Sequence, residues 1–598
     1  MHHASRDEEP ARSPQLEPAE PSSDQSLDQG SDQGLDQGLD QSLDQGSGRA
    51  GTTPRTPGPW WRLNVAGVIF GLIPAYLSLT PSLLPRPAIL QGVMTAVIFL
   101  LGYAFGRLLW AIGRRVLPWR VSARVRRNVW IGVLVVTAMG LSGLGAAALA
   151  WQNEVRELVE MPPGGAPHAG LFILGLLPVT LLGLAIGRGF STLYRRSRAR
   201  RGTPIALGIS VLVGIVAAAV IVSGAMFGVD RIYAASNAEP AEGLHAPTSS
   251  ERSGGPGSEI PWDTLGRHGA AFVSEGPDAQ QIRDVTGQPA IEPIRVYAGL
   301  KSAPTTRERA ALAVRELERT HAFERDVLVV ATATGSGWLE PQTVDAVEYL
   351  HGGNTAIVSM QYAYTPSWVS FVFDPDAPVA AARDLFDAVS AAIHAMPEGA
   401  HRPKLISYGL SLGAQGAQAV FTSLADVRAR TDGALFVGSP NGTPLWQKLQ
   451  AMRDPGSPEW QPVLGEGREV RWMAKSGDLD LLPGAWDYPR VAYLQHASDP
   501  VTWLGPDLLW QEPDWLTPGQ RSDQISPDMR WIPVVTAAQV LIDMLMGESV
   551  PARHGHNYGD LIVESWQAVT GSSVTDPAAL ARIQHTIMQM ASIQPFGG

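Results

Sequence analysis

The stretch "LISYGLSLGAQGAQAVF", residues 405–421, places Gly409, Ser411 and Gly413 in the pattern G-x-S-x-G. A β-like apolar run precedes the serine, and a helix-like run of small residues follows it. Such a strand-to-helix turn can present a serine hydroxyl above a sheet, provided that its neighbours are small. Glycine is abundant (62 of 598 residues), so chance alone would supply about 0.3 such matches. The surrounding sequence must therefore decide whether Ser411 is a nucleophile or a serine that caps a turn.

From about residue 261 onward, short β-rich runs alternate with helix-like segments. The β-rich runs are 326–334, 355–362, 404–409, 433–438 and 490–498, and the helix-like segments lie near 341–351, 378–396, 412–425 and 534–546. This alternation is typical of a mainly parallel sheet with helices on both faces. Residues 261–598 are therefore expected to form one α/β domain, with Ser411 at one of its strand-to-helix turns.

A serine hydroxyl needs a general base to act as a nucleophile at neutral pH, and the base needs a carboxylate to orient it. α/β-Hydrolases carry these groups in the chain order Ser, Asp or Glu, His. In "RVAYLQHASDPVTW", Asp499 follows the end of a predicted strand, which is the usual position of the acid. Asp478 and Asp480, in the less strand-like "KSGDLDLLPG", are the alternatives.

The candidates for the base are the histidines that follow Asp499, namely His554, His556 and His585. His585 lies in the apparent C-terminal helix "DPAALARIQHTIMQMAS", where a surface histidine is the simpler interpretation. The polar loop "PARHGHNYGD" carries the other two and can reach across to Ser411. The sequence favours His556, with His554 as the alternative.

A tetrahedral intermediate would need two backbone N–H donors. One is expected from Leu412, directly after the serine, and the other from the turn in "VVATATGSGWLEP", at Gly335, Ser336, Gly337 and Trp338. The sequence shows no metal-ligand cluster and no phosphate-binding P-loop, and it contains no cysteine. Neither a cofactor nor a metal is therefore expected.

The chain before residue 261 has a different character. Residues 1–58 are rich in Asp, Gln, Ser, Gly and Pro, which predicts a disordered acidic tail. Residues 59–230 contain five apolar stretches, each long enough to cross a hydrocarbon core of roughly 30 Å, near 63–84, 88–112, 129–151, 170–190 and 205–228. Tryptophans at the ends of these stretches suit the headgroup layer of a bilayer. We therefore expect a transmembrane bundle of about five spans, followed by a linker over residues 231–260.

Arginines are distributed unevenly among the loops that join these stretches. The loops after the second and fourth stretches are rich in arginine, whereas the other two loops carry only Arg86 and Arg156. Lysine and arginine near membrane ends are retained on the cytoplasmic side. With the N-terminus inside, an odd number of spans delivers the chain after residue 230 to the outside. The sequence thus predicts a multi-pass protein of the cytoplasmic membrane with a cytoplasmic N-terminus and an extracytoplasmic catalytic domain.

The net charge of −11 comes from acidic residues in the N-terminal tail and the C-terminal half. The arginine-rich loops are interpreted as topology signals and contacts for anionic lipids, not as one coherent basic face. Nucleic acid is therefore not an expected partner. The expected partners are the bilayer and a membrane lipid or envelope ester as substrate, and the sequence does not indicate an oligomeric state.

Several segments resemble a family of membrane-anchored bacterial α/β-hydrolases, which join an N-terminal multi-span domain to a C-terminal serine hydrolase domain. The matching segments are "TGSGW" (334–338), "YGLSLGAQG" (408–416), "YLQHASDPVTW" (493–503), "WIPVVTAAQV" (531–540) and "GHNY" (555–558). The resemblance implies that Ser411, Asp499 and His556 form the triad. It also implies an activity, the removal of amino acids from aminoacyl-phosphatidylglycerol.

Taken together, these observations predict a membrane-anchored serine ester hydrolase that acts on a lipid-linked or cell-envelope ester. An envelope acyltransferase with the same triad is one alternative, because a hydroxyl group could replace water as the acceptor. A non-catalytic membrane scaffold with a degenerate hydrolase fold is another. The predicted fold is an α-helical transmembrane bundle followed by an α/β-hydrolase domain with a mainly parallel sheet.

Overall fold

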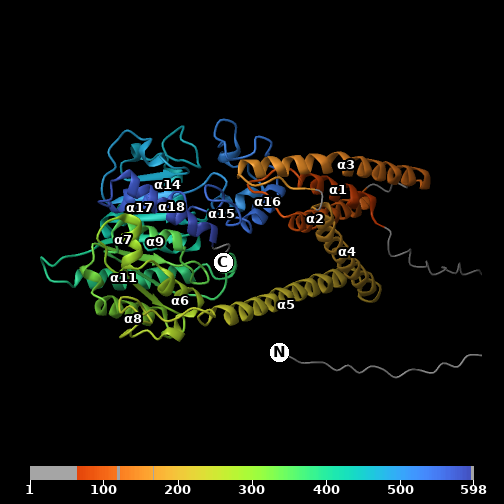
Figure 1. Cartoon of the computed structure of the whole chain (residues 1–598). Coiled ribbons are helices and arrows are strands. Elements are labelled where there is room, and N and C mark those ends of the chain that lie inside the picture. The colour runs from red at the N-terminus through yellow and green to blue at the C-terminus, as the bar shows by residue number, and fades with distance from the viewer. Residues whose placement is uncertain (1–62, 117–121, 166–167, 594–598) are drawn as a thin grey trace, which may run out of the picture. The chain divides into compact units, whose positions relative to one another are not determined.

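A computed structural model describes residues 63–116, 122–165 and 168–593. The expected acidic tail, residues 1–58, lies outside these ranges. The first described helices are α1 (Val65–Leu77), α2 (Ala88–Val116), α3 (Ala123–Leu158), α4 (His168–Arg201) and α5 (Thr203–Asn237) (Figure 1). By length and composition, α2 to α5 are all apolar enough to cross a membrane, which indicates a membrane protein.

The first expected span is shorter than the sequence suggested. α1 has 13 residues, or roughly 20 Å at about 1.5 Å per residue, which is less than a hydrocarbon core of about 30 Å. Pro74 lies inside α1, and further prolines follow its end at positions Pro81, Pro85 and Pro87. Because proline lacks the N–H that a helix requires, this segment does not continue as one long helix. The described residues therefore contain four long candidate spans where about five were expected.

A parallel sheet of seven strands forms the centre of the C-terminal half. The strands are β1 (Ile294–Ala298), β2 (Val327–Thr332), β3 (Thr355–Met360), β4 (Lys404–Leu410), β5 (Gly433–Val437), β6 (Val470–Met473) and β7 (Arg490–Leu494), in the spatial order β1-β3-β2-β4-β5-β7-β6. The register pairs Thr332 with Gly409, and Val437 with both Leu410 and Leu494. The residues that follow β2, β4, β5 and β7 therefore meet at one edge of the sheet, where open α/β folds bind ligands.

Six helices of this half form two groups of neighbours. α11 (Ala377–His394) contacts α8 (Thr306–Arg319) and α12 (Leu412–Ala419), whereas α9 (Pro341–Leu350) contacts α17 (Ile562–Thr570) and α18 (Pro577–Ile593). The other helices are α6 (Gly266–Glu275), α7 (Ala279–Thr286), α10 (Ser367–Phe373), α13 (Leu424–Arg430), α14 (Pro444–Ala451), α15 (Pro500–Trp503) and α16 (Val535–Met544). Apolar helices followed by an α/β domain with a parallel sheet are the fold class that the sequence predicted, and the structure confirms it.

Two strands, β1 and β6, were not predicted from the sequence. Each is short and carries an arginine, Arg295 in β1 and Arg471 in β6. Arg295 is buried and forms ion pairs with Asp345 and Glu348 of α9. Arg471 is also buried and donates to backbone carbonyl groups of the adjoining loops. Buried charges need such partners, and here the partners lie outside the two strands.

The segment between α1 and α2 packs into the α/β domain. Leu83 and Leu84 are buried, and their N–H groups donate to the carboxylate of Asp543 in α16, at 3.0 and 3.3 Å. Arg86 lies 3.6 Å from the same carboxylate, and neither charged side chain is exposed. This segment therefore contributes to the core that supports α16.

The segment expected as a linker, residues 231–260, contains ordered contacts. Residues 231–237 continue α5, and Asn237 Nδ2 donates to the Tyr364 carbonyl at 2.8 Å. Arg252 is buried and forms an ion pair with Glu292 at 3.0 Å. The chain between α5 and the sheet is therefore held on the α/β domain at these two points.

Candidate active site

Ser411 lies in a tight turn between β4 and α12. Its backbone has φ 56° and ψ −125°, a strained conformation for a residue with a side chain, and its N–H donates to the Val437 carbonyl at 2.9 Å. A Cβ atom on Gly409 would lie 2.3 Å from the Gly413 carbonyl oxygen, and one on Gly413 would lie 2.2 Å from that of Thr332. Both flanking positions of the motif therefore require glycine.

Asp499 follows β7 and caps the N-terminus of α15, where its Oδ1 accepts from the Val501 N–H at 2.8 Å. Its Oδ2 lies 2.7 Å from His556 Nδ1 and accepts from the Tyr558 hydroxyl at 2.6 Å. Burial alone would raise the pKa of Asp499, but His556 and these hydrogen bonds hold the pKa below its ordinary value. Asp499 is therefore a buried anion at neutral pH.

His556 lies in the loop after α16, with its ring buried. Its Nδ1 is held by Asp499, and its Nε2 has no hydrogen-bond partner among the described residues, the Ser411 hydroxyl included. Burial lowers the pKa of His556, but the Asp499 carboxylate outweighs it, so that the pKa is raised above its ordinary value. The ring fits because residue 438 is glycine: a Cβ on Gly438 would lie 2.3 Å from His556 Cε1.

His554, the alternative base, occupies a different place. It is buried, and neither ring nitrogen has a hydrogen-bond partner within the described ranges. Its Nε2 lies 4.0 Å from Glu160, beyond the end of α3, and burial lowers its pKa. His554 is not among the residues that line the pocket of Ser411. The structure thus brings His556, and not His554, beside Asp499.

Asp478, Asp480 and His585 lie away from this pair. Asp478 accepts from the backbone N–H groups of Ala474 and Lys475, at 2.9 and 2.8 Å, and so caps the turn after β6. Asp480 in the same turn is exposed. His585 is exposed on α18, as expected for a surface histidine. None of these three side chains contacts His556 or Ser411 in the described structure.

The segments "HASDP" and "GHNY", which lie far apart in the sequence, form one unit. His496 Nδ1 lies 2.9 Å from the Gly555 carbonyl oxygen, and the Gly555 N–H donates to the Ser498 hydroxyl at 3.0 Å. The His496 ring stacks on the Tyr558 ring, with centroids 4.3 Å apart. Sequence reasoning missed His496, Ser498 and Tyr558, although each lies within three residues of the proposed acid or base. Their role is to hold the two loops together.

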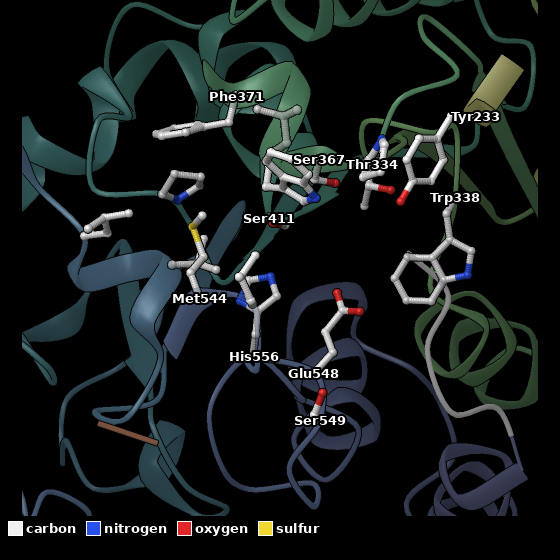
Figure 2. Close-up of a pocket in the computed structure, with 18 residues that line it drawn as sticks. Tyr233, Thr334, Trp338, Ser367, Phe371, Ser411, Met544, Glu548, Ser549 and His556 are labelled. Atoms are coloured by element: carbon white, nitrogen blue, oxygen red, sulfur yellow. The ribbon is translucent and has the colours of Figure 1, made fainter. Parts of the chain in front are cut away.

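Ser411 and His556 line one pocket of about 280 Å³ (Figure 2). Its walls are largely apolar and include Trp338, Trp368, Phe371, Val501, Leu504 and Met544. α5 contributes Tyr233, from the end of a candidate span. The pocket also contains a carboxylate that no sequence motif singled out, that of Glu548. The arrangement can hold a polar reacting group among apolar surroundings.

Only some of the residues expected to form an oxyanion hole line this pocket. Trp338 and Leu412 line it. The Gly335 N–H, however, donates to the Ser367 hydroxyl at 3.1 Å, and the Gly337 N–H donates within its own turn at 2.9 Å. Two of the expected donors are thus engaged with other groups in this structure.

Two family patterns match the chain. The pattern described as "Alpha/beta-hydrolase family" matches residues 294–583, and that described as "Alpha/beta-hydrolase family N-terminus" matches residues 79–277. Comparisons with curated proteins and with solved structures each gave no significant match. The two matched regions cover most of the chain and include α2 to α5 and the whole sheet. The chain therefore belongs to this α/β-hydrolase family, which supports a hydrolase-type function.

Proposed function

We propose that this chain is a membrane-anchored serine ester hydrolase, in which Ser411 is the nucleophile, His556 the base and Asp499 the group that orients the base. One observation carries the proposal: Ser411, in its strained turn, shares a pocket with His556, whose Nδ1 is held by a buried carboxylate. This arrangement activates a serine hydroxyl. The hydrogen bond between nucleophile and base is often loose in a resting enzyme, so its absence here is compatible with the proposal.

In the proposed reaction, Ser411 Oγ attacks the ester carbonyl carbon while His556 Nε2 takes the hydroxyl proton. Asp499 stabilises the imidazolium, and the Leu412 N–H, together with the turn after β2, donates to the oxyanion. The tetrahedral intermediate then breaks its ester C–O bond, and His556 gives its proton to the leaving alkoxide. Water attacks the acyl-enzyme with His556 again as base, which releases the acid and restores Ser411.

The proposed substrate is a lipid-linked or cell-envelope ester. The apolar walls of the pocket support this choice, as does Tyr233, which α5 brings to the pocket from the end of a candidate span. A site tethered to a bilayer meets lipid esters at a high effective concentration. The family resemblance of the sequence names aminoacyl-phosphatidylglycerol as one such ester, and it is the first substrate to test.

The proposed location of the site is the outer face of the cytoplasmic membrane. The arginine-rich loops, between α2 and α3 and between α4 and α5, are expected in the cytoplasm. The segments at the opposite helix ends contact the α/β domain: Arg86 pairs with Asp543, and Glu154 accepts a hydrogen bond from Ser526 at 2.7 Å. These contacts support a domain on the side away from the arginine-rich loops, whether or not α1 crosses the membrane.

A fluorophosphonate probe tests the proposed chemistry, because it reacts covalently with an activated serine. Membranes that contain the wild-type chain should be labelled, and those that contain Ser411→Ala should not. Labelling that survives Ser411→Ala, or a folded wild-type chain that is never labelled, would refute a serine hydrolase. Lipid analysis of a deletion strain, complemented with either form, should then show which ester accumulates.

The chain has no cysteine, so single cysteines can report the side of the membrane. Glu242→Cys, an exposed position after α5, should react with a membrane-impermeant maleimide in intact cells. Arg198→Cys, an exposed position near the end of α4, should react only after the cells are opened. The reverse pattern would place the proposed site in the cytoplasm.

A further inference from the structure

The helix α16 has its polar residues inside and its apolar residues outside. Thr536, Gln539 and Asp543 recur at helical spacing, and all three are 0% exposed. They form hydrogen bonds with the interior: Gln539 Nε2 donates to the Thr80 carbonyl at 2.9 Å, and Asp543 accepts from the Leu83 N–H at 3.0 Å. A helix at a water-exposed surface normally has the reverse arrangement.

The outward side of α16 is apolar. Leu541 and Leu545 lie one turn apart, Val534 stands at the start of the helix, and each of the three is between 46 and 48% exposed. The Val534 N–H donates to the Leu509 carbonyl at 3.1 Å, which brings the exposed side chains of Leu509 and Trp510 to the same end of the helix. We call these five residues the apolar stripe. Exposed apolar side chains that gather in this way mark a contact with another apolar surface.

The apolar stripe lies beside a candidate membrane span. Val535 of α16 packs on Met94 and Ile98 of α2. Residues 88–106 of α2 contain no charged residue, and at about 1.5 Å per residue they extend for about 28 Å, close to a hydrocarbon core of roughly 30 Å. Met94 and Ile98 come six and ten residues after the start of α2, so they lie about 9 and 15 Å along this run. When α2 spans a membrane, α16 therefore meets it at a level within the hydrocarbon layer.

The same helix forms part of the wall of the proposed active site. Met544 and Leu545, at the end of α16, line the pocket that holds Ser411 and His556 (Figure 2). Leu545 is also a member of the apolar stripe, so the stripe borders the pocket.

We propose that the apolar stripe is embedded in the hydrocarbon layer of the membrane beside α2, and that the pocket of Ser411 opens at the level of the lipid acyl chains. Leu541 and Leu545 then lie among the lipid tails, and Trp510 can place its indole in the headgroup layer, which tryptophan prefers. The contact with α2 favours lipid as the partner, because lipid already surrounds a membrane span. An ester lipid then reaches Ser411 by lateral movement, without a complete exit from the bilayer. This contact with the bilayer does not depend on which ester is cleaved.

Fluorescence quenching in vesicles tests the proposal. The chain has no cysteine, so a nitrobenzoxadiazole dye can be attached to a single introduced cysteine. Leu541→Cys and Leu545→Cys are each labelled in the full-length chain and reconstituted into vesicles of phosphatidylcholine and phosphatidylglycerol. Lipids that carry a nitroxide on the acyl chain should quench both dyes, because the dyes lie among the chains. The quenching constant of aqueous iodide should be several-fold lower for both dyes than for a dye in water.

The matched control is Ile291→Cys. Ile291 is 48% exposed, as Leu541 is, and it precedes β1 at the edge of the sheet opposite Ser411. Its dye should be open to iodide, and the nitroxide lipids should not quench it. Because Ile291 lies in the same α/β domain, it also corrects for the orientation of the protein in the vesicles. Gel filtration in detergent shows whether each variant is folded.

Iodide that reaches the Leu541 dye as readily as the Ile291 dye would overturn the proposal, because the stripe would then face water. Protection of the Leu541 dye from both quenchers would also overturn it and assign the stripe to a protein partner, such as a second copy of this chain. If only the Leu545 dye is open to iodide, the pocket opens to water and the second part of the proposal is wrong. Failure of the proposed hydrolase function is distinguishable, because it appears as a loss of fluorophosphonate labelling and quenching does not involve the serine.

Discussion

The buried pair of Arg86 and Asp543 tests whether the segment between α1 and α2 is a structural part of the α/β domain. Arg86 Nε lies 3.6 Å from Asp543 Oδ1, and both side chains have 0% exposure. Asp543 Oδ2 also accepts from the N–H groups of Leu83 and Leu84. The next residue in α16, Met544, lines the pocket of Ser411.

Removal of one partner leaves an uncompensated buried charge, which costs about 3–5 kcal/mol. Arg86→Met would leave Asp543 with its two backbone donors, and Asp543→Asn would leave Arg86 with the Thr80 carbonyl at 3.2 Å. Because these contacts remain, we expect each single variant to lower the free energy of unfolding by roughly 3 kcal/mol, the lower limit. The double variant buries no charge, so its loss of unfolding free energy should be about 2 kcal/mol smaller than the sum of the two single losses.

Heat inactivation of the full-length chain in detergent, followed by residual fluorophosphonate labelling, measures these effects. At roughly 2 °C per kcal/mol, each single variant should lower the midpoint by about 6 °C, and the double variant by about 8 °C instead of 12 °C. Arg315→Met is the matched control, because it breaks the half-exposed pair with Glu259 and should cost less than about 1 kcal/mol. Additive losses, or single losses no larger than that of Arg315→Met, would show that the two charges do not stabilise each other in the core.

Four further predictions concern the proposed site. As the pH is lowered, kcat/KM should fall with an apparent pKa above 6.5, the ordinary value of histidine. The reason is that Asp499 raises the pKa of His556 and only the neutral imidazole accepts the serine proton. Asp499→Asn should lower kcat by on the order of 10⁴-fold. It should also move this acidic limb to lower pH, because burial lowers the pKa of His556 once the carboxylate is gone. A limb that stays in place would contradict the proposed pairing of Asp499 with His556. Gly438→Ala should abolish the activity of a folded protein, because its Cβ would lie 2.3 Å from His556 Cε1, whereas Gly442→Ala, with nothing within 4 Å, should keep full activity in the same kinetic assay. Gly413→Ala should lower the thermal midpoint, because its Cβ would lie 2.2 Å from a backbone carbonyl oxygen; an unchanged melting curve would show that the turn tolerates a side chain.

The fold class could be predicted from the sequence because it depends on local patterns. Apolar length predicts candidate spans, and the alternation of β-rich and helix-like segments predicts a parallel sheet. The five expected strands correspond to β2, β3, β4, β5 and β7. The turn around Ser411 was also predictable, because Gly409 and Gly413 lie beside it in the chain and complete the motif. These features depend on neighbours in the sequence.

The elements that escaped prediction depend on partners far away in the chain. β1 contains Arg295, which would be unfavourable in a buried strand without Glu348, a residue 53 positions later. His554 and His556 lie in one loop and carry the same chemical group, so composition cannot separate them. The fold separates them, because Oδ2 of Asp499, 57 positions earlier, lies 2.7 Å from the ring of His556.

Long apolar helices, a parallel α/β domain and one serine in a strand-to-helix turn could all be predicted from the amino-acid sequence, because strands, helices and candidate spans follow from short-range periodicity and length. The three-dimensional packing was needed to establish which histidine meets Asp499, and that Glu548 and Tyr233 share a pocket with Ser411. A pocket is formed by side chains from distant segments. The charge of the pocket depends on which of its charged side chains have no ion-pair partner.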